Sequence, residues 1–230
     1  MGTKVEIHER FIGWAPPTGA VAGPQYYHAN GDALLVLSSA LGLGVLHTAG
    51  SPSIYGQFDA VAEIAHASIY LPPILDPAKE IYVRMKKRMT AIGDNAALDV
   101  DWGLANVIDA TTIADMGDAS LTKYALFHLD GNSANILARS SDASTTVSAT
   151  DTTIDNSLTV MKVFEIHKTS SGVVKLWIDG VQVLTSTTFA IPTSSASTGA
   201  LGVILNMEKT SDDTLGAWLL EELDIVGETV

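Results

Sequence analysis

The chain has no cysteine among its 230 residues, which excludes disulfides and thiolate metal ligands. Packing and hydrogen bonds alone must hold the fold. Aromatic residues make up only 7% of the chain and charged residues 17%, whereas 47% of the residues are hydrophobic. That apolar content is enough for one sizeable core, and no Ser/Pro-rich or charged linker divides the chain in two.

Positive charge is also scarce, with 13 lysines and arginines against 26 acidic residues and a net charge of −13. A field of this sign repels phosphate backbones, so we expect no nucleic-acid partner. Four of the cations cluster at Arg84, Lys86, Lys87 and Arg88 inside a strand-like segment. We expect them to form a solvated face of a sheet.

Long apolar runs are missing. The longest, residues 33–46, is interrupted by Ser38, Ser39, Gly42 and Gly44, and it is shorter than the roughly 20 residues that a membrane helix needs. The N-terminal segment lacks the apolar stretch and small-residue cleavage site of a secretion signal. We therefore expect no membrane partner and synthesis in a cytoplasm.

Alternation of apolar and polar side chains from residue 81 onward predicts β-strands. Ile81, Val83 and Met85 form one face, and Tyr82 and Arg84 form the other, with the period of two that marks a half-exposed strand. Several further segments of strand length end at Gly, Asp or Asn. The segments of strand length cover residues 98–104, 124–129, 135–139, 145–150, 161–168, 201–207 and 217–226.

The strongest hairpin signal is Asp179-Gly180, which separates the apolar residues 173–178 from residues 181–184. Both positions of such a pair tolerate the positive φ that a type I′ turn requires. Short strands joined by tight turns predict an all-β fold, an antiparallel β-sandwich.

The first 60 residues begin with a short strand-like segment through Phe11. The rest is rich in Gly, Pro and Ala and predicts an irregular arm. Residues 33–37 fit a buried strand or one helical turn equally well. A short helix over residues 108–116 has only weak support. The expected layout is an N-terminal arm, residues 1–60, packed on a sandwich of residues 61–230.

A resemblance to a known family rests on four segments: Tyr124-Ala-Leu-Phe-His-Leu-Asp-Gly, residues 134–142, Val163-Phe-Glu-Ile-His-Lys and Lys175-Leu-Trp-Ile-Asp-Gly-Val-Gln-Val. They resemble the core of the concanavalin A-like (laminin G-like) jelly-roll superfamily. The resemblance covers roughly residues 80–230 and is strongest to structural proteins of tailed bacteriophages.

The resemblance implies a capsid decoration (cement) protein on the virion surface, made in the host cytoplasm. Its partners would be the major capsid protein or other virion proteins, and further copies of itself. Placement on the head or on the tail stays open. The alternative is a lectin-like carbohydrate-binding module with exposed aromatic rings on a sheet. We expect the chain not to be an enzyme.

That expectation rests on a missing catalytic set. Glycoside hydrolases on this sandwich use paired carboxylates along one strand, and Glu222, Asp224 and Glu228 could supply them only with a bulge, because Gly227 holds the unbulged position. We favour a solvated closing strand and assign no catalytic residue. A glycosidase using Glu222 and Glu228 remains the third hypothesis.

No metal or cofactor is assigned. Among ions calcium fits best, through Asp94-Asn95 with Asp99 and Asp101, or through Asp130, Asn132 and Asn135. Trp102, Trp177 and Trp218 are expected in the core, and Trp14 lies in the arm. The histidines are scattered singly, without the spacing of metal ligands: His8, His28, His47, His66, His128 and His167.

Overall fold

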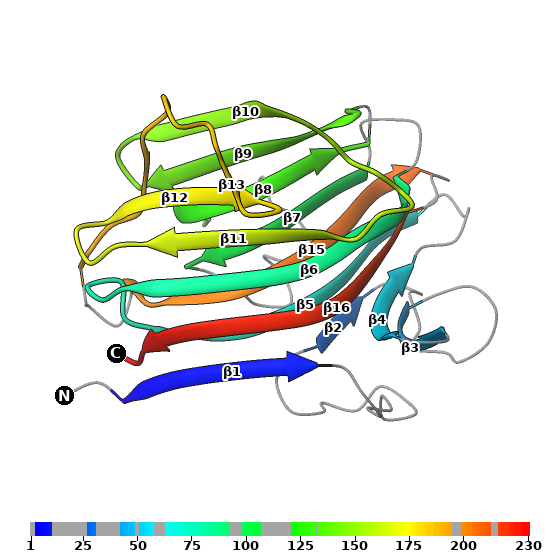
Figure 1. The fold of residues 1–230 in the computed structure, drawn as a ribbon, viewed down its shortest axis with the longest axis horizontal. Helices are drawn as coiled ribbons and strands as arrows, with labels where there is room; N and C mark the ends of the chain where they lie inside the picture. Colours follow the sequence, from blue (N-terminus) through cyan, green and yellow to red (C-terminus); the bar gives the residue numbers. More distant parts are fainter. Residues whose placement is uncertain are drawn as a thin grey trace.

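In the computed structural model, the described residues are 3–10, 27–30, 42–48, 51–57, 63–92, 98–106, 121–131, 133–194, 199–212 and 216–230. They form two antiparallel sheets that face each other (Figure 1). The predicted β-sandwich is therefore confirmed. Within these ranges no helix has the length and apolar character to cross a bilayer.

The first sheet has nine strands, and its outward face positions the site described below. β1 pairs along one edge of β16, and β14 pairs along β12. The main path runs β13 (Val181–Val183), β12 (Val173–Ile178), β11 (Lys162–Lys168), β6 (Ile81–Ile92), β16 (Gly216–Glu228), β4 (Ser51–Gln57) and β3 (Gly42–Thr48), with β1 (Lys4–Arg10) and β14 (Phe189–Ala190) beside it.

The second sheet has seven strands. Its order is β10 (Thr146–Asp155), β9 (Asn135–Asp142), β8 (Lys123–Asp130), β7 (Leu98–Ala105), β15 (Leu201–Asp212), β5 (Glu63–Leu75) and β2 (Tyr27–Asn30).

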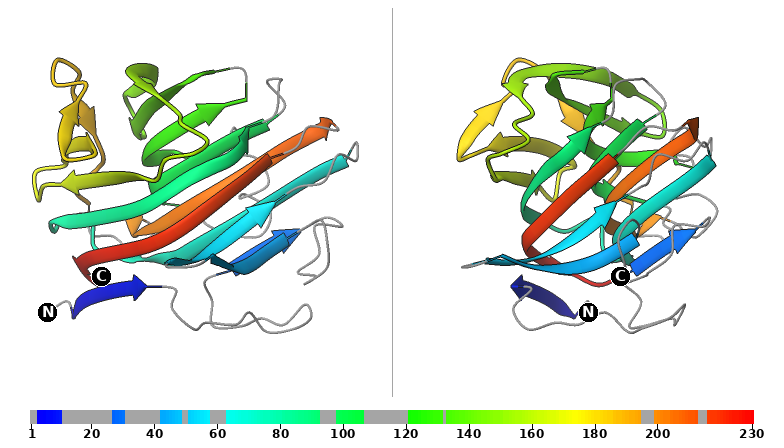
Figure 2. Two further views of the ribbon diagram at one scale, coloured as in Figure 1. Left: turned by 45° about the vertical axis from the view of Figure 1, so that its right-hand side comes forward. Right: turned by 90° about the vertical axis from the view of Figure 1, so that its right-hand side faces the viewer.

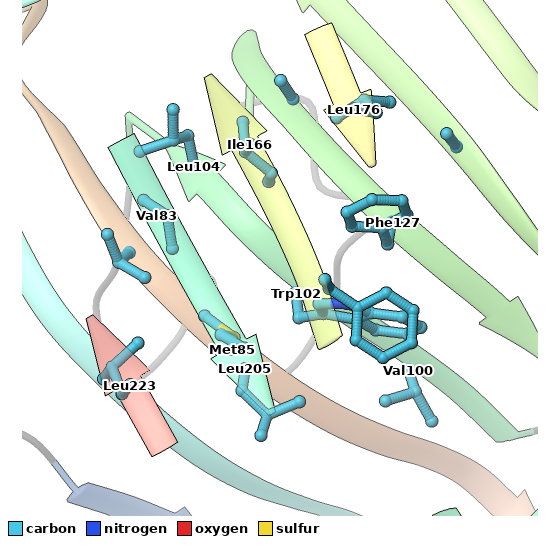
Figure 3. Packing of buried hydrophobic residues seen from close by; sticks show 14 of the residues in the cluster. Val83, Met85, Val100, Trp102, Leu104, Phe127, Ile166, Leu176, Leu205 and Leu223 are labelled. Carbon is cyan, nitrogen blue, oxygen red and sulfur yellow. The ribbon is translucent and has the colours of Figure 1, made fainter. Parts of the chain in front are cut away.

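The core fills the space between the sheets with the inward side chains that the alternation predicts. Trp102 of β7, Phe127 of β8 and Phe164 of β11 pack against one another, with ring centroids 4.9–5.7 Å apart. Figure 3 shows Trp102 and Phe127 within the core. Edge-to-face contacts of this kind stabilise a core beyond the area that they bury. Trp218 is also fully buried, so two of the three tryptophans expected in the core lie there.

The Asp179-Gly180 hairpin has the predicted geometry. Asp179 has φ 52° and Gly180 has φ 77°, which are the two positive values of a type I′ turn. The turn joins β12 to β13, and Ile178 pairs directly with Val181.

The first 60 residues contribute four strands, where we expected one short strand at the start and otherwise an irregular arm. The expected first strand is β1, which pairs with β16. β4 also pairs with β16 and carries β3 on its other side, and β2 pairs with β5 of the second sheet. These strands are short and lie among Gly and Pro, so composition alone conceals them. Residues 33–37 and 108–116 lie outside the described residues.

The two chain ends lie side by side because β1 runs antiparallel to β16 (Figure 2). Lys4 pairs with Glu228, and the backbone N–H of Thr229 donates to the carbonyl of Thr3 at 2.8 Å.

One member of the expected solvated cation cluster is instead buried. Lys87 is only 1% exposed and lies in the core, because it continues the inward alternation of β6 between Met85 and Met89. Its ammonium nitrogen lies 3.5 Å from the centroid of the Trp102 ring. Burial lowers the pKa of Lys87 to about 7.

Candidate functional site

A row of polar and aromatic residues crosses the outward face of the first sheet. Cross-strand pairing places Trp177 (β12), Glu165 (β11), Arg84 (β6), Asp224 (β16) and His8 (β1) side by side. Directly opposed residues on one face of a sheet are close enough to interact. We call these five residues the polar row.

Carboxylates fix Arg84 at the centre of the row. Its Nη1 donates to Glu222 Oε2 at 2.5 Å and to Asp224 Oδ2 at 3.1 Å. Partial burial alone would lower the pKa of Arg84, but these hydrogen bonds outweigh it and raise the pKa. Asp224 also contacts His8, with Oδ1 and Nδ1 2.9 Å apart. The side chains of Arg84, Asp224 and His8 in this half of the row are therefore connected by hydrogen bonds.

An open hollow of about 360 Å³ occupies the other half of the row, lined by Tyr82, Glu165, His167, Trp177 and Gly180. The Tyr82 hydroxyl donates to Glu165 Oε1 at 2.5 Å. Partial burial, and then this hydrogen bond, raise the pKa of Tyr82. The rings of His167 and Trp177 lie beside each other, with centroids 6.4 Å apart.

Trp177 corrects the expectation that it belongs to the core. It is only partly buried on the outward face of β12, because it alternates with the inward Leu176 and Ile178. Sequence reasoning also missed Tyr82, Glu165 and His167 as site residues. The signal was present, since Glu165 and His167 share the face of β11 opposite the buried Phe164 and Ile166.

The hollow combines an indole face with fixed polar groups. An exposed indole packs against the apolar face of a small molecule, while a carboxylate accepts hydrogen bonds from its hydroxyls. Because Tyr82 already donates to Glu165, the carboxylate is held in one position before any ligand arrives. Such a site suits a molecule with one apolar side and a hydroxylated edge.

A second cluster of charged groups lies on the outward face of the second sheet. The buried carboxylate of Asp101 (β7) accepts from Arg139 (β9), at 2.6 Å from Nη2 and 3.1 Å from Nε. His128 (β8) lies 3.2 Å from the same carboxylate through Nδ1, and its Nε2 is 3.7 Å from Asp99. The forked Arg–carboxylate contact fixes the geometry of all three strands.

The pKa values of the two aspartates of β7, Asp99 and Asp101, are shifted in opposite directions. Burial alone would raise the pKa of Asp101, but Arg139 and His128 outweigh it and lower the pKa. Burial raises the pKa of Asp99. Burial would lower the pKa of His128, but Asp101 raises it above its usual value. Neighbouring acids with separated pKa values are a feature of acid–base sites.

The calcium candidates are not brought together as ion ligands. Both Asp101 oxygens already contact Arg139, and the Asn135 amide donates to Asp151 at 3.0 Å. Within the part of the chain that the structure describes, no group of three or more His, Asp or Glu side chains could hold a metal ion. Asp94, Asn95 and Asn132 lie outside the described residues.

The candidate glycosidase pair is not brought together either. The two register shifts of β16 against β6 both precede Glu222, and pairing is regular from Glu222 to Val226. Six residues of strand place Glu228 roughly 20 Å beyond Glu222, far more than the 5–5.5 Å that retaining hydrolysis needs. Glu222 contacts Arg84, and Glu228 lies 3.4 Å from Lys79 Nζ.

No known protein family and no curated protein matches the chain, but solved structures share its fold. A protein of unknown function from Shewanella oneidensis MR-1 has a TM-score of 0.62 at 12% identity, covering 100% of this chain and 88% of that chain. The carbohydrate recognition domain of Emp47p has a TM-score of 0.54 at 8% identity, covering 93% of each chain.

The alginate lyase AlgAT5, from Polysaccharide Lyase family 7, has a TM-score of 0.52 at 11% identity, covering 90% of this chain and 84% of that chain. The expectation that the chain is not an enzyme is therefore corrected, because an enzyme has the same sandwich. At these identities the likeness concerns architecture, and the chain has a concanavalin A-like, jelly-roll β-sandwich fold.

Proposed function

We propose that the chain is a lectin-like, carbohydrate-binding module that seats a sugar ring in the hollow beside Trp177. The observation that carries the proposal is the partly exposed Trp177 next to the Glu165 carboxylate, which Tyr82 holds in place. The apolar face of a sugar ring packs on the indole, and the ring hydroxyls donate to Glu165. The fold shared with a carbohydrate recognition domain supports the proposal.

The hollow is open and has a single indole, so we expect modest affinity. A dissociation constant of about 1 mM corresponds to roughly −4 kcal/mol, a range that a single stacked ring and a few hydrogen bonds supply. Detection therefore needs multivalent display or millimolar ligand.

A glycan array with the wild-type chain and Trp177→Ala tests the proposal. Trp177 lies outside the core, so its removal should leave the fold intact. The Trp177→Ala variant should no longer bind the glycans that the wild type binds. Lys175→Ala, which changes an exposed residue of the same strand face, is the matched control and should keep most of the binding. Equal binding by wild type and Trp177→Ala contradicts the proposal.

A second candidate function is glycan cleavage at the Asp101 cluster. Asp99, whose pKa is raised, pairs directly with Glu208 of β15 on the same outward face. Opposed side chains have Cβ atoms about 4.5–5.5 Å apart, close to the spacing of acid and nucleophile in retaining hydrolases. Asp99 would protonate the leaving oxygen while the Glu208 carboxylate attacks the anomeric carbon, and water would then hydrolyse the glycosyl–Glu208 bond. Release of reducing ends by the wild type but not by Asp99→Asn would support this candidate, and equal release would end it.

The sequence resemblance leads us to propose that the module is displayed on the virion of a tailed bacteriophage. It would dock on the major capsid protein as a decoration protein and associate with further copies of itself. Mass spectrometry and electron cryomicroscopy of purified particles test this placement. Absence of the chain from the particle would contradict it without affecting the glycan proposal.

A further inference from the structure

We infer that the ligand of this module is a linear oligosaccharide that runs diagonally across the first sheet, from the hollow at Trp177 to a second hollow at Lys4 and Lys79. This inference rests on the proposed function and concerns the class of ligand. A single sugar would occupy only the first hollow.

The second hollow also measures about 360 Å³ and lies where the chain ends meet the turn that precedes β6. Val226 is part of its lining and pairs directly with Tyr82 across β16 and β6. Tyr82 in turn lines the first hollow. The two hollows therefore lie on one face, and a directly paired residue lines each of them.

The path is longer than one sugar ring. From β12 it crosses β11, β6 and β16 to reach β1, and these five strands follow one another across the front of the molecule in Figure 1. Four strand spacings span about 19 Å, and four residues along the strands add about 13 Å, which gives a diagonal of roughly 23 Å. A short linear oligosaccharide has this reach.

The chemistry of the two hollows is complementary. The first offers the indole and the Glu165 carboxylate, whereas the second offers the ammonium groups of Lys4 and Lys79 beside the carboxylates of Glu80 and Glu228. Lys79 lies 3.4 Å from Glu228 and Lys4 pairs with Glu6, yet their side chains are 46% and 67% exposed. Each ammonium has three donors, so donors remain for sugar oxygens after the carboxylate contacts.

Among the residues that the structure describes, no aromatic ring lines the second hollow. The second hollow therefore adds hydrogen bonds to an oligosaccharide that is already anchored at Trp177, and it does not bind a sugar by itself. This predicts a specific pattern: affinity rises with oligosaccharide length, and the rise depends on the lysines. The affinity for the shortest ligand depends on the first hollow, with Trp177 and Glu165, and not on the lysines.

Isothermal titration calorimetry with cello-, manno- and chito-oligosaccharides, from disaccharide to hexasaccharide, tests the inference. For the series that binds, we expect about tenfold higher affinity for the hexasaccharide than for the disaccharide, equivalent to about 1.4 kcal/mol. Lys79→Ala should remove most of this gain and leave disaccharide binding unchanged. Lys123→Ala, which removes a lysine from the second sheet, is the matched control and should keep the full gain.

Equal affinity for all lengths, or a full gain in Lys79→Ala, overturns the inference while the glycan-binding function stands. If no oligosaccharide binds the wild type, or if Trp177→Ala binds the disaccharide as well as the wild type does, the proposed function itself fails. Binding of a long chain that needs Lys79 but not Trp177 also overturns the inference, because it moves the anchor to the second hollow.

Discussion

The ammonium nitrogen of Lys87 lies 3.5 Å from the centroid of the Trp102 indole ring, in the core between the two sheets. Phe164 approaches the same nitrogen, at 5.4 Å to its ring centroid. Aromatic faces attract a cation, but they replace only part of the hydration that burial removes. The folded chain therefore favours the neutral amine, and the pKa of Lys87 falls to about 7.

Lys87→Met should stabilise the fold at neutral and acidic pH. The unfolded chain retains the ordinary lysine pKa of 10.5, so it binds more protons than the folded chain between about pH 7 and pH 10.5, and the free energy of unfolding rises with pH in that window. Below pH 7 the full cost of the buried charge remains. Urea unfolding at about pH 6 should show a gain of about 2–4 kcal/mol for Lys87→Met, after allowance for the aromatic attraction.

Lys86→Met is the control for that measurement. Lys86 lies on the outward face of the same strand and pairs with Glu221 at 2.5 Å, so its loss should change stability little at any pH. If Lys87→Met is less stable than the wild type at about pH 6, the buried amine is not the destabilising group.

Lys168→Met should loosen the turn before β6. The Lys168 ammonium donates to the backbone carbonyls of Pro77, Lys79 and Thr169. Its removal leaves partly buried carbonyls without that donor, at a cost of about 2–3 kcal/mol. Amide hydrogen exchange should accelerate around residues 76–80 before other parts of the sandwich. Unchanged protection there would contradict the assigned role.

Arg139→Ala should destabilise the second sheet strongly. It leaves the buried carboxylate of Asp101 without its guanidinium partner, a loss of about 3–5 kcal/mol. The double variant Arg139→Ala with Asp101→Ala should recover part of that loss, because no buried charge remains. Thermal unfolding of the single and double variants measures the coupling, and additive effects would show that the pair does not act as a unit.

Acid should weaken the same cluster in the wild type. The pKa of Asp101 is lowered in the folded chain, so its contribution is fully present above the ordinary aspartate range and is lost as the pH falls through the folded-state value. In Asp101→Asn, the acid limb of the stability curve should be shallower. An identical acid limb in both proteins would show that Asp101 does not contribute to it.

Tyr82→Phe should reduce glycan affinity without affecting the fold. The change removes only the hydroxyl that holds Glu165, at 2.5 Å, and Tyr82 is partly exposed. We expect a five- to tenfold weaker affinity, corresponding to the loss of about 1 kcal/mol of hydrogen-bond energy. The melting temperature should stay within a few degrees of the wild type. Unchanged affinity would show that Glu165 needs no positioning by Tyr82.

Much of the architecture could be predicted from local pattern. The alternation in β6 and the Asp179-Gly180 pair carry their structure in adjacent residues, since period two and a type I′ turn are local properties. Among the strands of the first 60 residues, β2 and β4 could not be predicted, because they are ordered by pairing with β5 and β16, which lie far away in the sequence. Long-range pairing has no local signature.

The candidate site was harder to predict for the same reason. Glu165 and Arg84 are far apart in sequence and meet only through the register between β11 and β6. The acidic motif at Glu222 to Glu228 drew attention because its residues are sequence neighbours, yet a regular strand keeps its ends apart. For Lys87 the local pattern was sufficient, because the alternation of β6 indicated an inward position. We nevertheless expected this charged residue to face the solvent.

The hydrogen bond between Thr229 and Thr3 makes the chain suitable for circular permutation. A short linker could join the two ends, and new ends could be opened at the exposed turn around residues 143–145 between β9 and β10. In the permuted chain β1 and β16 would become a covalent hairpin. A comparison of its folding rate with that of the wild type would then show how much the pairing of β1 with β16 slows folding.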